Sequence, residues 1–80
     1  MSEAFYEAVL DRVRMVVGRT DIELDQRMQE DLLVDSMTFI RLVVDLETTM
    51  NVVFRDEDLD IENFPTVRDL GIYLASTSDA

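Results

Sequence analysis

The sequence reads VDSMTFIRLVVDLETTM from Val34 to Met50. Asp35 is a favoured N-cap residue, which would place Ser36 at the first helical position. Apolar residues then recur at helical spacing, at Met37, Ile40, Val43, Val44, Leu46 and Met50. Phe39 and Leu42 widen the apolar surface beyond one stripe, so we expect a central helix over residues 36–50 that is contacted on two sides.

The chain before this segment divides into a helix and a long loop. Apolar residues at steps of four and three predict an amphipathic helix of about four turns, namely Phe5, Val9, Val13, Val16 and Val17. Gly18 follows where the pattern fails, as in a left-handed C-terminal cap. From Arg19 to Val34 there is no helical period, so we expect a loop that is partly pinned to the core. The residues that can fold back are Ile22, Leu24, Met28 and Leu32.

The chain after the central segment is more broken. Residues 51–55 are predicted to form an extended connector, residues 56–61 a short helical turn, and residues 63–65, Asn-Phe-Pro, a break. Thr66 and Asp69 resemble a capping box for a last helix. Its expected buried stripe is Val67, Leu70 and Leu74, with Tyr73 on the flank. The small polar residues 76–80 are expected to fray.

These elements predict an all-α fold in a single domain over residues 1–80. It has three main helices, a fourth short one, and one long loop after the first helix. With 80 residues, only one modest core can form.

The composition excludes several classes of function. The chain has 18 acidic and 7 basic residues, a net charge of −11, so nucleic acid and anionic membrane surfaces are poor partners. It has no His, Cys, Trp or Lys, which removes thiol nucleophiles, Ser-His triads, Schiff-base lysines and thiolate or imidazole zinc sites. No export signal or membrane span is apparent, so we expect a cytoplasmic protein without membrane insertion.

Asp56, Asp58 and Asp60 alternate as in the opening of an EF-hand calcium loop. The sixth position of that motif would be Ile61 instead of Gly, and the twelfth would be Val67 instead of Glu. No pair of carboxylates is singled out for acid–base work. We therefore expect no metal site and no catalytic residues.

Ser36 is the hydroxyl of most interest. It lies in the first turn of an apolar helix, where backbone N–H groups and the helix dipole favour an esterified phosphate by about 0.3 to 1 kcal/mol. The alternative is that Asp35 and Ser36 are only a capping pair.

The surrounding pattern favours a site. Residues 30–37, EDLLVDSM, followed by an apolar helix and then residues 66–70, TVRDL, resemble the acyl and peptidyl carrier proteins. The resemblance spans nearly the whole chain and implies a four-helix bundle of the acyl-carrier type. It implies that Ser36 receives 4′-phosphopantetheine from coenzyme A and that Asp35 is the preceding motif residue. The thiol that carries the cargo then lies on this arm, so the chain itself is expected to be a carrier and not an enzyme.

Two residues depart from the family pattern. Carriers commonly have Gly two residues before the motif Asp, where this chain has Leu33. Leu33, the Asp-Ser-Met element and residues 60–66 look more like D-alanyl and discrete aminoacyl carriers than like fatty-acid carriers. Arg41 stands where fatty-acid carriers often have an acidic residue.

The expected partner surface is the second helix and the residues before it. Asp31, Asp45 and Glu47 would offer negative charge together with Asp35, and Met37 and Val34 an apolar patch beside the serine; Arg41 belongs to the same surface. The alternatives are that Asp45 and Glu47 are only a solvated face and that Met37 is ordinary core. By resemblance the partners are a phosphopantetheinyl transferase, an acyl- or aminoacyl-loading ligase, and an acyltransferase, ketosynthase or condensation enzyme.

The predicted function is that of a stand-alone, monomeric carrier that holds an acyl or aminoacyl group as a thioester, in polyketide or nonribosomal peptide biosynthesis. One alternative is a D-alanyl carrier for cell-wall modification. The other is an unmodified acidic helical adaptor for a basic protein, which would use Asp45 and Glu47 and not Ser36.

Overall fold

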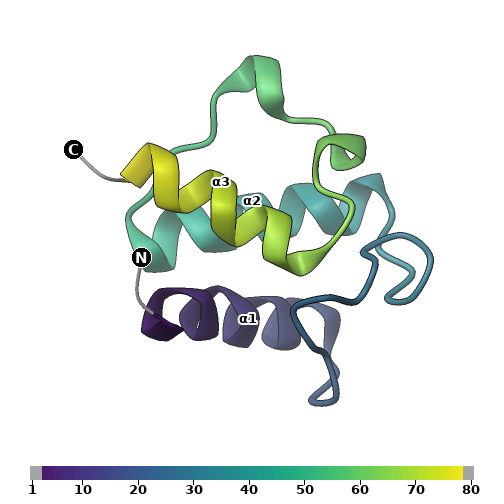
Figure 1. Cartoon of the computed structure of the whole chain (residues 1–80). Coiled ribbons are helices and arrows are strands. Elements are labelled where there is room, and N and C mark those ends of the chain that lie inside the picture. The colour runs from purple at the N-terminus through teal and green to yellow at the C-terminus, as the bar shows by residue number, and fades with distance from the viewer. Residues whose placement is uncertain (1–2, 79–80) are drawn as a thin grey trace.

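The computed structural model of the chain describes residues 3–78 and is helical (Figure 1). Its three α-helices are α1 (Glu3–Val17), α2 (Ser36–Met50) and α3 (Val67–Ser78). Two short 3₁₀ turns, η1 (Asp56–Asp58) and η2 (Ile61–Asn63), lie between α2 and α3. The all-α prediction is confirmed, with two 3₁₀ turns in place of one short fourth helix.

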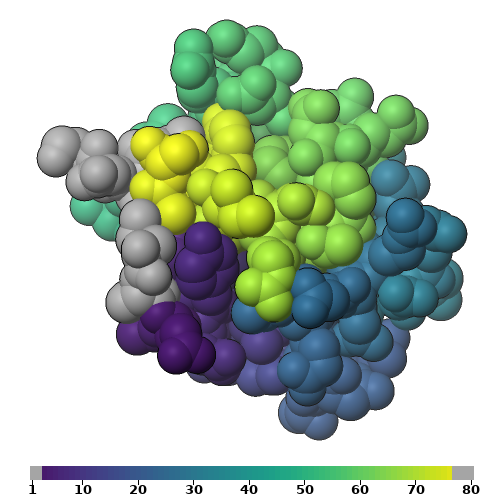
Figure 2. All heavy atoms as spheres, in the orientation of Figure 1, coloured from purple at the N-terminus to yellow at the C-terminus, as the bar shows by residue number. Residues whose placement is uncertain are grey.

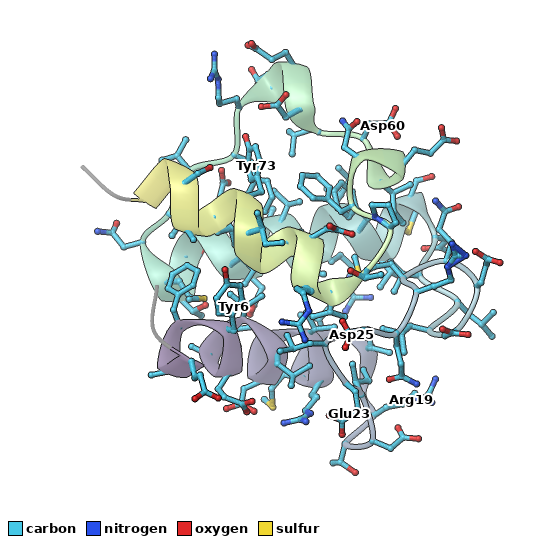
Figure 3. The ribbon with its side chains drawn as sticks, viewed as in Figure 1. Tyr6, Arg19, Glu23, Asp25, Asp60 and Tyr73 are labelled. Carbon is cyan, nitrogen blue, oxygen red and sulfur yellow. The ribbon has the colours of Figure 1, made fainter. Side chains whose placement is uncertain are left out.

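Helix α1 packs against both α2 and α3 (Figure 1). Gly71 allows α3 to approach α1 closely, because a Cβ at this position would lie 2.5 Å from Cδ1 of Tyr6. Figure 3 shows Tyr6 pointing from α1 toward α3. Helix α1 ends at Gly18, whose φ of 82° is the left-handed cap expected from the sequence.

The long loop after α1 is pinned to the core and to the start of α3. Ile22, Met28 and Leu32 are buried and Leu24 is partly buried, which confirms that these residues fold back. The N–H of Met28 donates to the Pro65 carbonyl at 2.8 Å. Figure 2 shows the loop residues packed beside the beginning of α3 at one end of the bundle.

Helix α3 begins with the predicted capping box. The Asp69 carboxylate accepts from the Thr66 N–H at 3.0 Å, and the Thr66 hydroxyl accepts from the Asp69 N–H at 3.3 Å. Val67, Leu70 and Leu74 are buried as expected. The helix continues to Ser78, so it includes residues 76–78 of the expected tail, whose fraying stays a prediction. Residues 79–80 lie outside the described residues.

Aromatic rings from α2, the connector, the segment after η2 and α3 meet between α2 and α3. Phe39 of α2 stacks on Phe64 with ring centroids 5.8 Å apart, and Phe54 of the connector stacks on Tyr73 of α3 at 5.4 Å. The rings of Phe64 and Tyr73 meet edge to face at 5.3 Å. The Tyr73 hydroxyl accepts from the Arg55 N–H and donates to the Asp58 carboxylate, which fixes η1 over α3. The connector thus fills the space between the two helices.

Helix α2 buries only part of the apolar surface that its sequence predicted. Phe39, Leu42, Val43 and Leu46 are buried. Met37, Ile40 and Val44 are exposed, although Ile40 and Val44 were expected on the buried side. Apolar residues occur on both faces of this helix, so their period cannot select the buried one. The face is selected by α1 and by the aromatic connector, which pack against α2 from one side.

The two adjacent valines of α2 give a direct test of this orientation. We expect Val43→Ala to lower the free energy of unfolding by about 1 to 3 kcal/mol because it leaves a cavity in the core. Val44→Ala should change it by no more than about 0.5 kcal/mol, because Val44 is exposed. Urea titrations of both variants measure the difference. Equal losses at the two positions would contradict the orientation of α2 described above.

Candidate functional site

Ser36 is the first residue of α2, and its side chain is exposed. Asp35 precedes it in extended conformation and caps the helix: its carboxylate accepts from the Thr38 N–H at 2.8 Å, and its carbonyl accepts from the Phe39 N–H at 2.8 Å. The predicted N-cap is confirmed. Because the cap uses the Asp35 carboxylate, the serine hydroxyl lies at the helix entrance and faces solvent.

The same contact determines the charge of Asp35. Hydrogen bonding from the Thr38 backbone N–H lowers the pKa of the Asp35 carboxyl below its ordinary value. The carboxylate is therefore ionised at neutral pH.

Leu33 is an exposed residue between two buried ones, Leu32 and Val34, which fix the backbone before Ser36. Leu32 and Val34 are buried, and the Val34 N–H donates to the Met28 carbonyl at 2.9 Å. Between them, Leu33 has a φ of 57° and a side chain that is 79% exposed. Val34 was expected in an apolar patch beside the serine, and this is wrong. The alternation of the chain turns Val34 into the core and presents Leu33 in its place.

Shallow hollows flank Ser36. One, of about 620 Å³, is lined by Asp35, Ser36, Met37, Ile40 and Arg41. The other, of about 200 Å³, runs from Ser36 toward η2 and is lined by Phe39, Ile40, Leu59, Asp60 and Ile61. A group esterified to the hydroxyl would therefore meet open, mainly apolar surface, and the residues present fit a covalently attached phosphate ester.

Two acidic residues of the expected partner surface serve the fold instead. Asp45 accepts two hydrogen bonds from the guanidinium of Arg12, each 2.8 Å long, which join α2 to α1. The Glu47 carboxylate accepts from the Phe54 N–H at 3.0 Å and holds the connector against α2. Both side chains are partly buried, so Asp45 and Glu47 are more than a solvated face, and their contact with a partner stays a prediction.

The remaining expected surface residues are exposed. Asp31 is exposed, although its carboxylate also accepts from the Arg27 N–H at 2.9 Å. Met37 is 74% exposed and is therefore not part of the core. Arg41 is exposed and makes none of the ion pairs found within residues 3–78.

Within residues 3–78, no group of three or more potential ligands is close enough together to hold a metal ion. No helix in this range is long and apolar enough to cross a membrane.

Comparison with known proteins identifies the family. Residues 7–74 match the family model described as the phosphopantetheine attachment site. The chain is 31% identical over 75 residues to an acyl carrier protein of Aster yellows witches'-broom phytoplasma, covering 91% of this chain and 96% of that protein. It is 37% identical over 65 residues to an acyl carrier protein of Onion yellows phytoplasma, covering 81% and 83%. An acyl carrier protein of Lactobacillus johnsonii is 33% identical over 76 residues, covering 92% of each chain.

The chain therefore belongs to the phosphopantetheine-binding carrier proteins, and its prosthetic group is 4′-phosphopantetheine. That group supplies a thiol, which the chain itself lacks because it contains no cysteine. The resemblance that was seen in the sequence is confirmed.

Some residues of the site could not be found from the sequence. Leu33 was recognised only as a departure from the family pattern, and that departure was the sole signal for its left-handed backbone. Leu59 and Ile61, which line the hollow toward η2, have no signal near Ser36, since they lie more than 20 residues away along the chain. The pairing of Asp45 with Arg12 spans 33 residues and has no local signal.

The ion pair at Asp45 predicts a particular dependence of stability on pH. The hydrogen bonds from Arg12 lower the pKa of Asp45 in the folded protein below its ordinary value of 3.8. The stabilisation is therefore fully present above the ordinary pKa and is lost as the pH falls through the lower, folded pKa. We expect Asp45→Asn to be destabilised by a constant amount from neutral pH to about pH 5, and the difference from wild type to shrink below about pH 4.

Urea titrations at a series of pH values measure this difference. Asp56→Asn is the control, because Asp56 is exposed and makes none of the ion pairs found within residues 3–78. It should differ little from wild type at any pH. A difference for Asp45→Asn that stays constant down to about pH 2 would contradict the assigned ion pair.

Proposed function

We propose that Ser36 is the residue that receives the 4′-phosphopantetheine arm, and that the modified chain carries an acyl or aminoacyl group as a thioester between enzymes. The observation that carries this proposal is the exposed serine at the capped entrance of α2. Ser36 also lies within the residues matched by the family model.

The chemistry of attachment asks little of this chain. Ser36 Oγ forms a phosphodiester with the phosphorus of coenzyme A that bears pantetheine. The bond between the two phosphates breaks, and adenosine 3′,5′-bisphosphate leaves with its electrons. The hydroxyl proton passes to a base of the transferase. The entrance of α2 favours the new negative charge by about 0.3 to 1 kcal/mol, and the open hollows on both sides admit the enzyme and the arm.

The chain's part in later steps is to display the arm. Its exposed residues nearest to Ser36 supply no thiol, imidazole or amine that could act on the cargo, because the sequence contains no Cys, His or Lys. We therefore propose a non-catalytic carrier whose reactions are performed by its partners. Those partners are a phosphopantetheinyl transferase, a loading ligase and a downstream acyltransferase, ketosynthase or condensation enzyme, with the cytoplasm as their common compartment.

For the cargo we propose acyl or aminoacyl transfer in polyketide or nonribosomal peptide biosynthesis. D-Alanyl transfer to the cell wall is the second candidate, favoured by Leu33 followed by the Asp-Ser-Met element. The curated relatives are named only as acyl carrier proteins, which is compatible with either cargo. An unmodified adaptor is not proposed, because the acidic residues on which it depended, Asp45 and Glu47, hold the fold together.

The attachment is tested by mass. Purified unmodified chain is incubated with coenzyme A and a promiscuous phosphopantetheinyl transferase, and intact masses are compared for wild type, Ser36→Ala and Ser76→Ala. We expect wild type and Ser76→Ala to gain one arm and Ser36→Ala to gain none. Ser76 is a matched control because it is also exposed but lies in α3, far from the proposed site along the chain.

Either of two results would overturn the assignment of Ser36. One is no gain of mass by the wild-type chain. The other is an equal gain by wild type and Ser36→Ala.

A further inference from the structure

The two hollows that flank Ser36 carry different charges. The larger hollow is lined by the guanidinium of Arg41 together with the carboxylate of Asp35. The smaller one, toward η2, is lined by the carboxylate of Asp60 and by no basic residue. A negatively charged group attached to Ser36 therefore meets an arginine on one side only.

Arg41 is free to bind an anion. Six of the seven arginines form an ion pair within residues 3–78, namely Arg12, Arg14, Arg19, Arg27, Arg55 and Arg68. Arg41 is exposed and forms none in this range. Asp35 lines the same hollow but is not paired with Arg41, and its carboxylate accepts instead from the Thr38 N–H at 2.8 Å.

The position of Arg41 on α2 brings its side chain toward the serine. Arg41 follows Ser36 by five residues, which is about 7.5 Å along the helix axis. Long side chains of an α-helix lean toward its N-terminus, so an extended Arg41 carries its guanidinium toward the entrance of α2. Met37 and Ile40 line the same hollow and are exposed, so apolar surface lies beside the arginine.

A phosphodiester on Ser36 would add a negative charge beside Asp35, in a chain whose net charge is already −11. The Asp35 carboxylate is ionised at neutral pH, because the hydrogen bond from Thr38 lowers its pKa. Asp35 directly precedes Ser36, so its charge repels the phosphate whichever hollow the phosphate faces. Asp60 and Arg41 distinguish the two sides, since one repels an anion and the other attracts it.

We propose that Arg41 is a positioning residue for the arm: its guanidinium pairs with the phosphodiester on Ser36 and holds the base of the arm in the larger hollow, away from η2. The inference rests on the proposed attachment at Ser36 and adds the side of the serine on which the arm lies. A guanidinium suits this role because two of its N–H groups can donate to two phosphate oxygens at once. The methyl groups of pantetheine next to the phosphate would then cover Met37 and Ile40.

Nuclear Overhauser effects between the arm and the chain test this position. The ¹³C-labelled chain is modified with unlabelled coenzyme A, its thiol is kept reduced, and contacts of the pantetheine methyl groups are recorded with an isotope filter. We expect contacts with Met37 and Ile40 and none with Leu59 or Ile61, the apolar residues of the smaller hollow.

Variants of Arg41 test its part in these contacts. Arg41→Gln should weaken them about threefold, in line with the strength of an exposed ion pair. Arg41→Glu should abolish them, and Arg41→Lys, which keeps the charge, should retain them. The urea midpoint of unmodified Arg41→Gln should equal that of the unmodified wild type, because Arg41 is exposed and forms no ion pair in the described chain.

The ³¹P chemical shift of the phosphodiester is a second measurement that requires no partner enzyme. We expect Arg41→Gln to move this resonance. Raising the salt concentration should move the wild-type resonance in the same direction, because salt screens the ion pair. Arg55→Gln is the matched control, since it makes the same change of charge at an exposed arginine of the connector and should leave the resonance in place.

Three results would overturn the inference while the mass shows one arm on Ser36. The arm could contact Leu59 or Ile61 instead of Met37, or it could contact no residue of the chain. The contacts and the ³¹P shift could also be the same in wild type and Arg41→Gln, so that the arm would be held without the arginine. Absence of an arm on the wild-type chain would overturn the proposed function itself and is read from the mass before these measurements.

Discussion

Backbone hydrogen bonds between the loop after α1 and the start of α3 are the constraint on which the site depends. Arg68 donates to the Leu24 carbonyl and Met28 to the Pro65 carbonyl, both at 2.8 Å, and Met28 in turn accepts from Val34. The loop has no helix or sheet of its own, so pairing with the residues at the start of α3 satisfies backbone groups that its own turns leave free. Because Val34 is fixed in this way, Asp35 is placed to cap the first turn of α2. Ser36, the first residue of the helix, is then exposed to solvent.

Charged side chains also join segments that are distant in the sequence. Arginines that join segments distant in the chain are placed against single carboxylates, as Arg12 is against Asp45 and Arg68 against Asp25. The first of these pairs is only partly accessible to solvent, whereas the second is more exposed and contributes less to stability. The net charge of −11 therefore overstates how acidic the exposed face of α2 is, since its two carboxylates are engaged.

Features decided within a few residues could be predicted from the sequence. The Gly18 cap, the Asp35 cap and the Thr66–Asp69 box each depend on atoms no more than four residues apart, and all three are confirmed. The orientation of α2 could not be predicted, because both of its faces are apolar. The buried face is the one against which segments distant in the sequence pack. The serine could be predicted because its motif is local. The roles of Asp45 and Glu47 could not, because they depend on contacts with α1 and the connector.

The aromatic contact between α2 and α3 gives the molecule a built-in optical reporter. The chain has no tryptophan and two tyrosines, and the ring of Tyr73 is stacked on Phe54 while its hydroxyl bonds to Arg55 and Asp58. Figure 3 shows Tyr73 extending from α3 toward the connector. Burial raises the pKa of its hydroxyl above the ordinary value. Near-ultraviolet circular dichroism of tyrosine would thus follow any separation of α3 from the connector, without a label.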